Sequence, residues 1–214
     1  YSGQIPFVNP AAGNTHLFRL AAGSTVAGRL YLCDRLWHQS GLTVTTTTAQ
    51  TVNSVAFPSR CPDAAGGNDP TALGHSVLVG LECSVATTNG AAVTNTVFSY
   101  TDSAGNAGST GAMGSWPQTA AIGTFVPFSL AAGDVGVRSV QTVTLGTSYG
   151  AGAVHLVAYR MLAELSAGPG LPGEIDMLTS GFQRLYDNSV PFLLWLPSAT
   201  TSAVITGGLV YTQG

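Results

Sequence analysis

The sequence contains one stretch whose residue types and spacing could form a nucleophilic active site. Residues 146–150 (GTSYG) have the G-x-S-x-G pattern of the turn that presents a serine nucleophile in α/β-hydrolases. That turn must lead into a helix, whereas residues 153–162 alternate as a strand does. The only later histidine, His155, also precedes every remaining carboxylate, although such hydrolases place the acid before the histidine. We interpret the stretch as a glycine-rich hairpin turn and retain a serine hydrolase using Ser148 as an alternative.

Patterns that would bind a cofactor or a metal ion are also incomplete. Residues 168–173 (GPGLPG) fit G-x-G-x-x-G, but two prolines remove N–H donors that a pyrophosphate needs, and no βαβ unit surrounds them. The four histidines show no paired spacing and no C-x-x-C occurs. Asp63, Asn68 and Asp69 could bind Ca²⁺ through their side-chain oxygens, but the same residues are also found in ordinary polar loops that hold no metal. We predict a non-enzymatic protein with no catalytic residue, cofactor or metal ion, and leave open whether the loop 58–73 holds a metal.

Charged residues are scarce along the whole chain. They make up 8% of the 214 residues, against about 25% in an average soluble domain. The seven basic residues are all arginines, they are scattered singly, and the net charge is −3. Nucleic-acid binding needs several cations on one face, so this composition argues against such a partner. The uncharged runs 139–159 and 188–214 contain polar residues and prolines that argue against a membrane span.

The scarcity of charge also bears on how the surface is used. A soluble monomer usually relies on surface charge for colloidal stability, but this chain offers Thr, Ser, Asn and Gln instead. Burying much of the surface against copies of itself or against other proteins is one way to tolerate so few charges. We therefore predict a homo-oligomer, although secreted β modules rich in Thr and Ser have a similar composition.

The hydrophobic pattern is that of β-strands. Residues 75–85 alternate cleanly, with Val77, Val79 and Leu81 on one face and polar residues opposite. Further strands are predicted at residues 29–38, 42–55, 92–101, 124–130, 135–145, 153–162, 191–196 and 202–211, the first two forming a pair. The sequence therefore predicts an all-β fold: an antiparallel β-sandwich, jelly-roll-like, with long loops and little helix.

The remaining segments set the predicted domain organisation. Residues 1–27 are predicted to be an irregular N-terminal arm that packs on a neighbour, and residues 28–214 a single β-sandwich domain. One helix is predicted over 174–187, where apolar residues recur near helical spacing despite an internal glycine. Loops are predicted at residues 58–73, 102–117 and 167–173, which are rich in Gly, Pro, Ser and Asp.

Four phrases of the sequence resemble those of small structural proteins encoded by tailed bacteriophages, often found among virion head components. They are residues 36–42 (LWHQSGL), 128–140 (FSLAAGDVGVRSV), 155–160 (HLVAYR) and 185–197 (LYDNSVPFLLWLP). They are spread along the chain between residues 36 and 197. They contain no catalytic motif, so the resemblance carries over no functional residue.

The resemblance implies a cement or decoration protein that bridges capsomers of a phage head assembled in the host cytoplasm. It implies contacts with the major capsid protein or other virion proteins, and it favours a homotrimer. For the interface we predict Phe192 and Trp195 in the uncharged C-terminal segment, together with Met113 and Trp116. A fibre or spike domain that binds host glycans is the alternative, and it would need an exposed aromatic platform at Trp116 or Tyr149.

Overall fold

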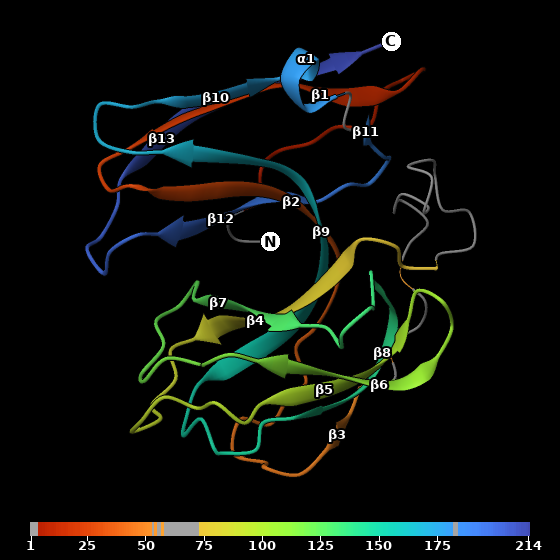
Figure 1. Cartoon of the computed structure of the whole chain (residues 1–214), viewed down its shortest axis with the longest axis vertical. Coiled ribbons are helices and arrows are strands. Elements are labelled where there is room, and N and C mark those ends of the chain that lie inside the picture. The colour runs from red at the N-terminus through yellow and green to blue at the C-terminus, as the bar shows by residue number, and fades with distance from the viewer. Residues whose placement is uncertain (1–3, 53, 55–56, 58–72, 182–183) are drawn as a thin grey trace. The chain divides into compact units, whose positions relative to one another are not determined.

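The computed structural model describes residues 4–52, 54, 57, 73–181 and 184–214. Within these residues the chain forms thirteen strands and one helix of four residues (Figure 1). The elements are β1 (Thr15–Ser24), β2 (Gly28–Gln39), β3 (Gln50–Thr51), β4 (Val77–Val85), β5 (Val97–Asp102), β6 (Ala107–Met113), β7 (Phe125–Ser129), β8 (Val137–Thr144), β9 (Ala153–Ala167), β10 (Gly173–Asp176), α1 (Met177–Ser180), β11 (Arg184–Leu185), β12 (Pro191–Pro197) and β13 (Ile205–Gln213). The predicted all-β, antiparallel class is confirmed.

The chain divides into two compact units. Unit 1 comprises Tyr1–Arg35 and Met161–Gly214, and unit 2 comprises Leu36–Arg160. The long strands β2 and β9 each contribute residues to both units. The predicted division into an arm and a single sandwich domain stays a prediction.

Unit 1 is a sandwich of two small sheets. In one sheet β13 pairs with β1 along its whole length, and β10 and β11 share the other edge of β1. In the other sheet the strand order is β12-β2-β9. Apolar side chains that point inward from both sheets form its core: Leu17, Leu20, Ala22, Leu30, Leu32, Leu162, Ala163, Leu165, Ala167 and Leu185.

Unit 2 contains the strand order β9-β4-β7-β6-β5-β8-β3. The link between β7 and β6 is only two residue pairs long, at Ala112–Ser129 and Met113–Phe128. A core shared by β4, β5, β8 and β9 buries Val77, Val79, Leu81 and Cys83 on one face of β4, as the alternation of residues 75–85 predicts. Jelly-roll connectivity remains a prediction.

Most predicted strands are present, with shifted ends. The exception is the segment 42–55, whose described residues form a strand at Gln50–Thr51 alone, and that strand pairs with β8. The predicted hairpin of this segment with residues 29–38 is therefore wrong. Strand β2 instead lies between β12 and β9.

Two further predictions need correction. The predicted helix over 174–187 is reduced to the four residues of α1, because β10 continues to Asp176 and Gly181 has a φ of 72° that ends the helix. Residues 15–24, predicted to be irregular, form β1 at the centre of a sheet. Their pattern mixes Arg19 and Gly23 with alanines, and it becomes a strand because β13 and β10 pair with it.

Candidate functional site

The serine of the G-x-S-x-G stretch lies in a turn that joins two strands. The Ser148 hydroxyl oxygen accepts a hydrogen bond from the Gly150 N–H at 3.1 Å. Residues 145–152 are all described, and they contain no helix before β9 begins at Ala153. The strand–turn–helix geometry of a hydrolase nucleophile is therefore not formed at this serine.

Two histidines lie together on neighbouring strands of unit 2. The rings of His38 and His155 have centroids 5.6 Å apart, and Glu82 is the register partner of His155 on β4. No group of three or more His, Cys, Asp or Glu in the described part of the chain is arranged to hold a metal ion. The predicted candidates for Ca²⁺, Asp63, Asn68 and Asp69, lie outside the described residues.

The aromatic residues proposed for a glycan platform are in the core of unit 2. Trp116 and Tyr149 are both fully buried, with stacked rings whose centroids are 5.1 Å apart. The Trp116 indole N–H donates to the Thr87 hydroxyl at 3.2 Å, and the Tyr149 hydroxyl bonds to that of Thr96 at 2.7 Å. Burial raises the pKa of Tyr149 to about 12. This pair is packed for stability, and neither ring is available to a sugar.

The prediction of an interface at Met113 and Trp116 conflicts with their burial. Met113 ends β6 and is 3% exposed, beside Phe128 of β7. The sequence places both residues in a loop because residues 102–117 are rich in Gly and Ser. That segment contains β6, whose small residues pack against β5. The two side chains belong to the core of unit 2.

The other two predicted interface residues lie on β12, an outer strand of unit 1. Phe192 is buried, with the Arg35 guanidinium 5.1 Å from its ring centroid and Gln4 bridging to it on the open side of β12. Trp195 is half-buried and packs over Gly28, where a Cβ would stand 2.6 Å from the indole. Between and beside them, Leu193 and Leu196 are exposed. Leu193 and Leu196 therefore provide the exposed apolar surface of β12, and neither is among the interface residues predicted from the sequence.

A buried carboxylate fixes the chain just before β12. Asp34 accepts hydrogen bonds from the Ser189 hydroxyl at 3.0 Å and from the Val190 N–H at 2.8 Å. Burial, with a smaller effect of the Asp34 charge, raises the pKa of the neighbouring Cys33 thiol to about 12. That thiol stays protonated at neutral pH and is a core residue with little nucleophilic character.

The N-terminal segment contacts its own unit. The Ile5 N–H donates to the Pro191 carbonyl at 2.8 Å, and the Phe7 ring meets Tyr211 edge-on at 5.7 Å. Asn9 accepts from the Asn188 N–H at 2.8 Å. Residues 5–9 belong to the arm that is predicted to pack on a neighbouring subunit. In the structure they pack along β12 and β13 of their own unit.

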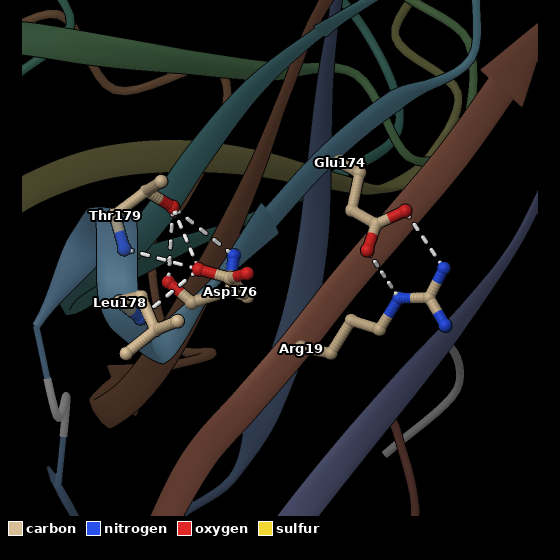
Figure 2. A network of polar contacts seen from close by, with 5 residues as sticks. All are labelled: Arg19, Glu174, Asp176, Leu178 and Thr179. Atoms are coloured by element: carbon tan, nitrogen blue, oxygen red, sulfur yellow. Dashed lines mark hydrogen bonds and ion pairs between the residues drawn. The ribbon is translucent and has the colours of Figure 1, made fainter.

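Polar contacts also join β1, β10 and α1 in unit 1. Figure 2 shows Arg19 of β1 paired with Glu174 of β10 at 2.7 Å, and Asp176 capping α1. The Asp176 carboxylate accepts from the N–H groups of Leu178 and Thr179, and the bond from Thr179 is the main cause that lowers its pKa. These interactions are those of a helix cap and an exposed ion pair, and they have a structural role.

An apolar groove of about 290 Å³ lies beside β12 and β13. Its polar lining is limited to backbone, since every residue around it is Gly, Ala, Leu or Ile: Ile5, Leu20, Ala21, Ala22, Leu30, Leu193, Ile205, Gly207, Gly208 and Leu209. In the sequence, the uncharged run 188–214 points to this groove. In the structure that run forms the two outer strands β12 and β13. The groove offers apolar contact and no catalytic group.

Comparison with known proteins does not extend these observations. No protein-family model, curated protein or solved structure matches the chain. No helix among the described residues is long and apolar enough to cross a membrane.

Proposed function

We propose that this chain is a non-enzymatic structural protein of a tailed-bacteriophage virion, acting as a cement or decoration protein of the head. The observation that carries the proposal is the uncharged surface of β12 and β13. Residues 188–214 contain no charged side chain, and they leave Leu193, Leu196, Val204 and Val210 between 42% and 63% exposed. These residues are exposed on outer strands, with Leu193 and Leu196 on opposite faces of β12, and exposed apolar side chains of this kind support a role in protein–protein contact. The virion as the place of that contact comes from the resemblance of the four sequence phrases.

The function proposed for this surface is mechanical. Apolar and hydroxyl-bearing side chains are buried between copies of the chain and against capsid proteins, and no covalent chemistry is needed. A contact of about 1,600 Å² is ordinary for a specific protein–protein interface. Repetition over a shell makes such contacts effectively permanent, because a subunit held at several points must release all of them together. The homotrimer favoured by the resemblance stays part of the proposal.

The test is to locate the protein on the particle and to remove it. Cryo-electron microscopy of virions should show its density over the shell. Heads assembled without it should release DNA at a lower temperature and after milder osmotic shock, and adding the purified protein should restore their resistance. Density on a projecting fibre, or depleted heads as resistant as complete ones, would overturn the cement role.

A further inference from the structure

We propose that β13 is a self-pairing edge, through which unit 1 of one copy joins unit 1 of a second copy in antiparallel fashion across a two-fold axis. This deepens the proposed function and rests on it, because it names the second copy as the partner of an assembling surface. Strand β13 pairs with β1 and with no other strand of the described residues. Its second edge, called the open edge below, therefore has no strand partner among the described residues, although Phe7 packs on the Tyr211 side chain near one end.

The open edge presents unpaired backbone groups in a regular row. At one end of β13 the Val204 carbonyl accepts from the Thr25 N–H at 3.1 Å, and at the other Gly214 bonds to Asn14 through both its N–H and its carbonyl. Residues that bond to a given neighbour alternate along an antiparallel strand. The even-numbered residues thus bond to β1, and the N–H and C=O groups of the odd-numbered residues from Ile205 to Gln213 point to the open edge.

Nothing in the sequence of β13 protects this edge from pairing. Soluble proteins usually block an open edge with charged side chains, a proline or a bulge. Residues 198–214 contain no charged residue and no proline. The one irregularity of the β1–β13 pair adds a residue to β1, between Leu17 and Arg19, and leaves β13 regular. The edge is therefore ready to accept another uncharged strand.

The groove beside β13 gives the second strand an apolar surface to cover. Ile205 and Leu209 line the groove and pack on the core of unit 1. A two-fold contact joins odd-numbered residues to odd-numbered residues, so the inward side chains of one copy stay on the same sheet face as those of the other. The inward side chains of the two β13 strands then cover the groove at the edge of unit 1 in both copies.

The overlap of the whole strand sets the register, and Gly208 fits it; Gly207 is required by its own unit, where a Cβ would stand 2.2 Å from the Ala21 carbonyl oxygen. Full overlap of Ile205–Gln213 with itself places the axis at Leu209, so that Gly207 faces Tyr211 of the partner subunit and Gly208 faces Val210 of the partner subunit. Within its own unit Gly208 has no atom within 4 Å of where a Cβ would stand, and its φ is not positive. Unit 1 itself therefore does not require glycine at this position, whereas a large residue directly opposite would favour one.

The first test is a cross-link that only this register allows. Even-numbered residues form the non-hydrogen-bonded pairs, whose Cα atoms lie about 4.5 Å apart, close enough for a disulfide. A Gly208→Cys chain mixed with a Val210→Cys chain should give a disulfide-linked dimer under mild oxidation. Each variant alone should give far less, because identical residues are then diagonal to each other. The wild type in the same oxidant controls for the native cysteines.

The second test uses charge to separate the copies and to rejoin them. The full chain should run as an even-numbered oligomer in analytical ultracentrifugation: a dimer, or a hexamer where a trimer also forms. The Gly208→Lys/Val210→Lys variant should halve that mass, since like charges face each other across the axis. The Gly208→Glu/Val210→Lys variant should restore it. The matched control Ile122→Lys/Val135→Lys, at two exposed positions of unit 2, should leave the mass unchanged.

The outcomes separate this inference from the proposed function. A monomer or a trimer whose mass ignores the β13 charges, or a 208/210 mixture that does not cross-link, would overturn the two-fold contact even with the protein seated on the head. An even-numbered oligomer with the cross-link would support the contact even with the protein absent from virions. Circular dichroism of each variant confirms that a loss of mass is not a loss of fold.

Discussion

Trp116 and Tyr149 show how a residue's environment differs from what its sequence neighbours imply. Each lies in a stretch rich in Gly, Ser and Thr, where an exposed aromatic is a reasonable expectation. In the structure their rings stack inside unit 2, and each polar atom bonds to a buried threonine hydroxyl. Large aromatics contribute most to stability when both ring and polar atom are accommodated in this way.

We predict that Trp116→Ala lowers the free energy of unfolding by about 3–5 kcal/mol, because it leaves a large cavity and removes a ring contact. Urea titration followed by circular dichroism measures this value. Ile122→Ala, at a position 71% exposed, is the control and should change stability by about 0.5 kcal/mol or less. A loss as small as the control's would show that Trp116 is not packed as described.

A second prediction isolates the hydroxyl of Tyr149. The Thr96 hydroxyl is bonded both to Tyr149 and, at 2.8 Å, to the Leu145 carbonyl. Tyr149→Phe keeps the ring stack but leaves the buried Thr96 oxygen with one partner fewer, which costs about 1–2 kcal/mol. The double variant Tyr149→Phe/Thr96→Val should cost less than the sum of the two single variants, because the two side chains share the bond. Additive costs would contradict the bond.

At the scale of elements, alternation predicted the strands that have one buried face. Strand β4 is the clearest case, since Val77, Val79, Leu81 and Cys83 are all 0–1% exposed. Alternation could not predict β6, whose sequence AGSTGAM lacks β-branched and aromatic residues apart from one threonine. In that strand Gly111 leaves room for the ring of Phe98 on β5, a contact between strands that no local pattern shows. The outer strand β13 was predicted, but its open edge depends on which strands pair.

This contact between β5 and β6 gives a prediction. Gly111 lies opposite Phe98, and a Cβ on it would stand 2.0 Å from the phenylalanine ring. Gly111→Ala should therefore displace that ring from its packing on Tyr100 and Phe128 and cost about 1–3 kcal/mol. Gly114→Ala, just past the end of β6 with no atom within 4 Å, is the matched control. Equal thermal midpoints for the two variants would contradict the close approach.

The turn between β5 and β6 provides a pH prediction. The Asp102 carboxylate accepts from the side chain and the N–H of Asn106, both at 2.8 Å, and these bonds lower its pKa, the side-chain bond most. A carboxyl group whose pKa is lower in the folded chain stabilises the fold above its unfolded pKa, here near 3.8. That stability is lost as the pH falls through the folded pKa.

The difference in unfolding free energy between the wild type and Asp102→Asn should therefore be largest near neutral pH and shrink below about pH 4. Urea midpoints measured from pH 7 downward give the comparison. Asp187→Asn, at an exposed position, supplies the control. A difference that stays constant down to acid pH would show that the carboxylate charge does not stabilise this turn.

At the scale of the whole molecule, composition and structure lead to one expectation about the surface of unit 1. A chain with 8% charged residues still exposes Leu193 and Leu196 on β12 and Val210 on β13. The uncharged segment is evident from the sequence. The interface residues predicted within it, Phe192 and Trp195, are its large aromatic residues. The two aromatics lie on opposite faces of β12, where Phe192 meets Arg35 and Trp195 covers Gly28. Selecting the exposed residues requires knowledge of what covers each position of β12, because each face of the strand carries one of these aromatics and one exposed leucine.

Leu196, 60% exposed on β12, is the residue at which the proposed capsid contact is best tested. Leu196→Glu should weaken binding of the purified chain to heads assembled without it by at least about tenfold, or about 1.4 kcal/mol, because the contact would bury an unpaired charge. Co-sedimentation at increasing protein concentration measures the affinity. Ile122→Glu adds the same charge at an exposed position of unit 2 and should bind as the wild type does. Equal affinities of Leu196→Glu and the wild type would remove the β12 surface from the interface, and a loss confined to Ile122→Glu would move the interface to unit 2.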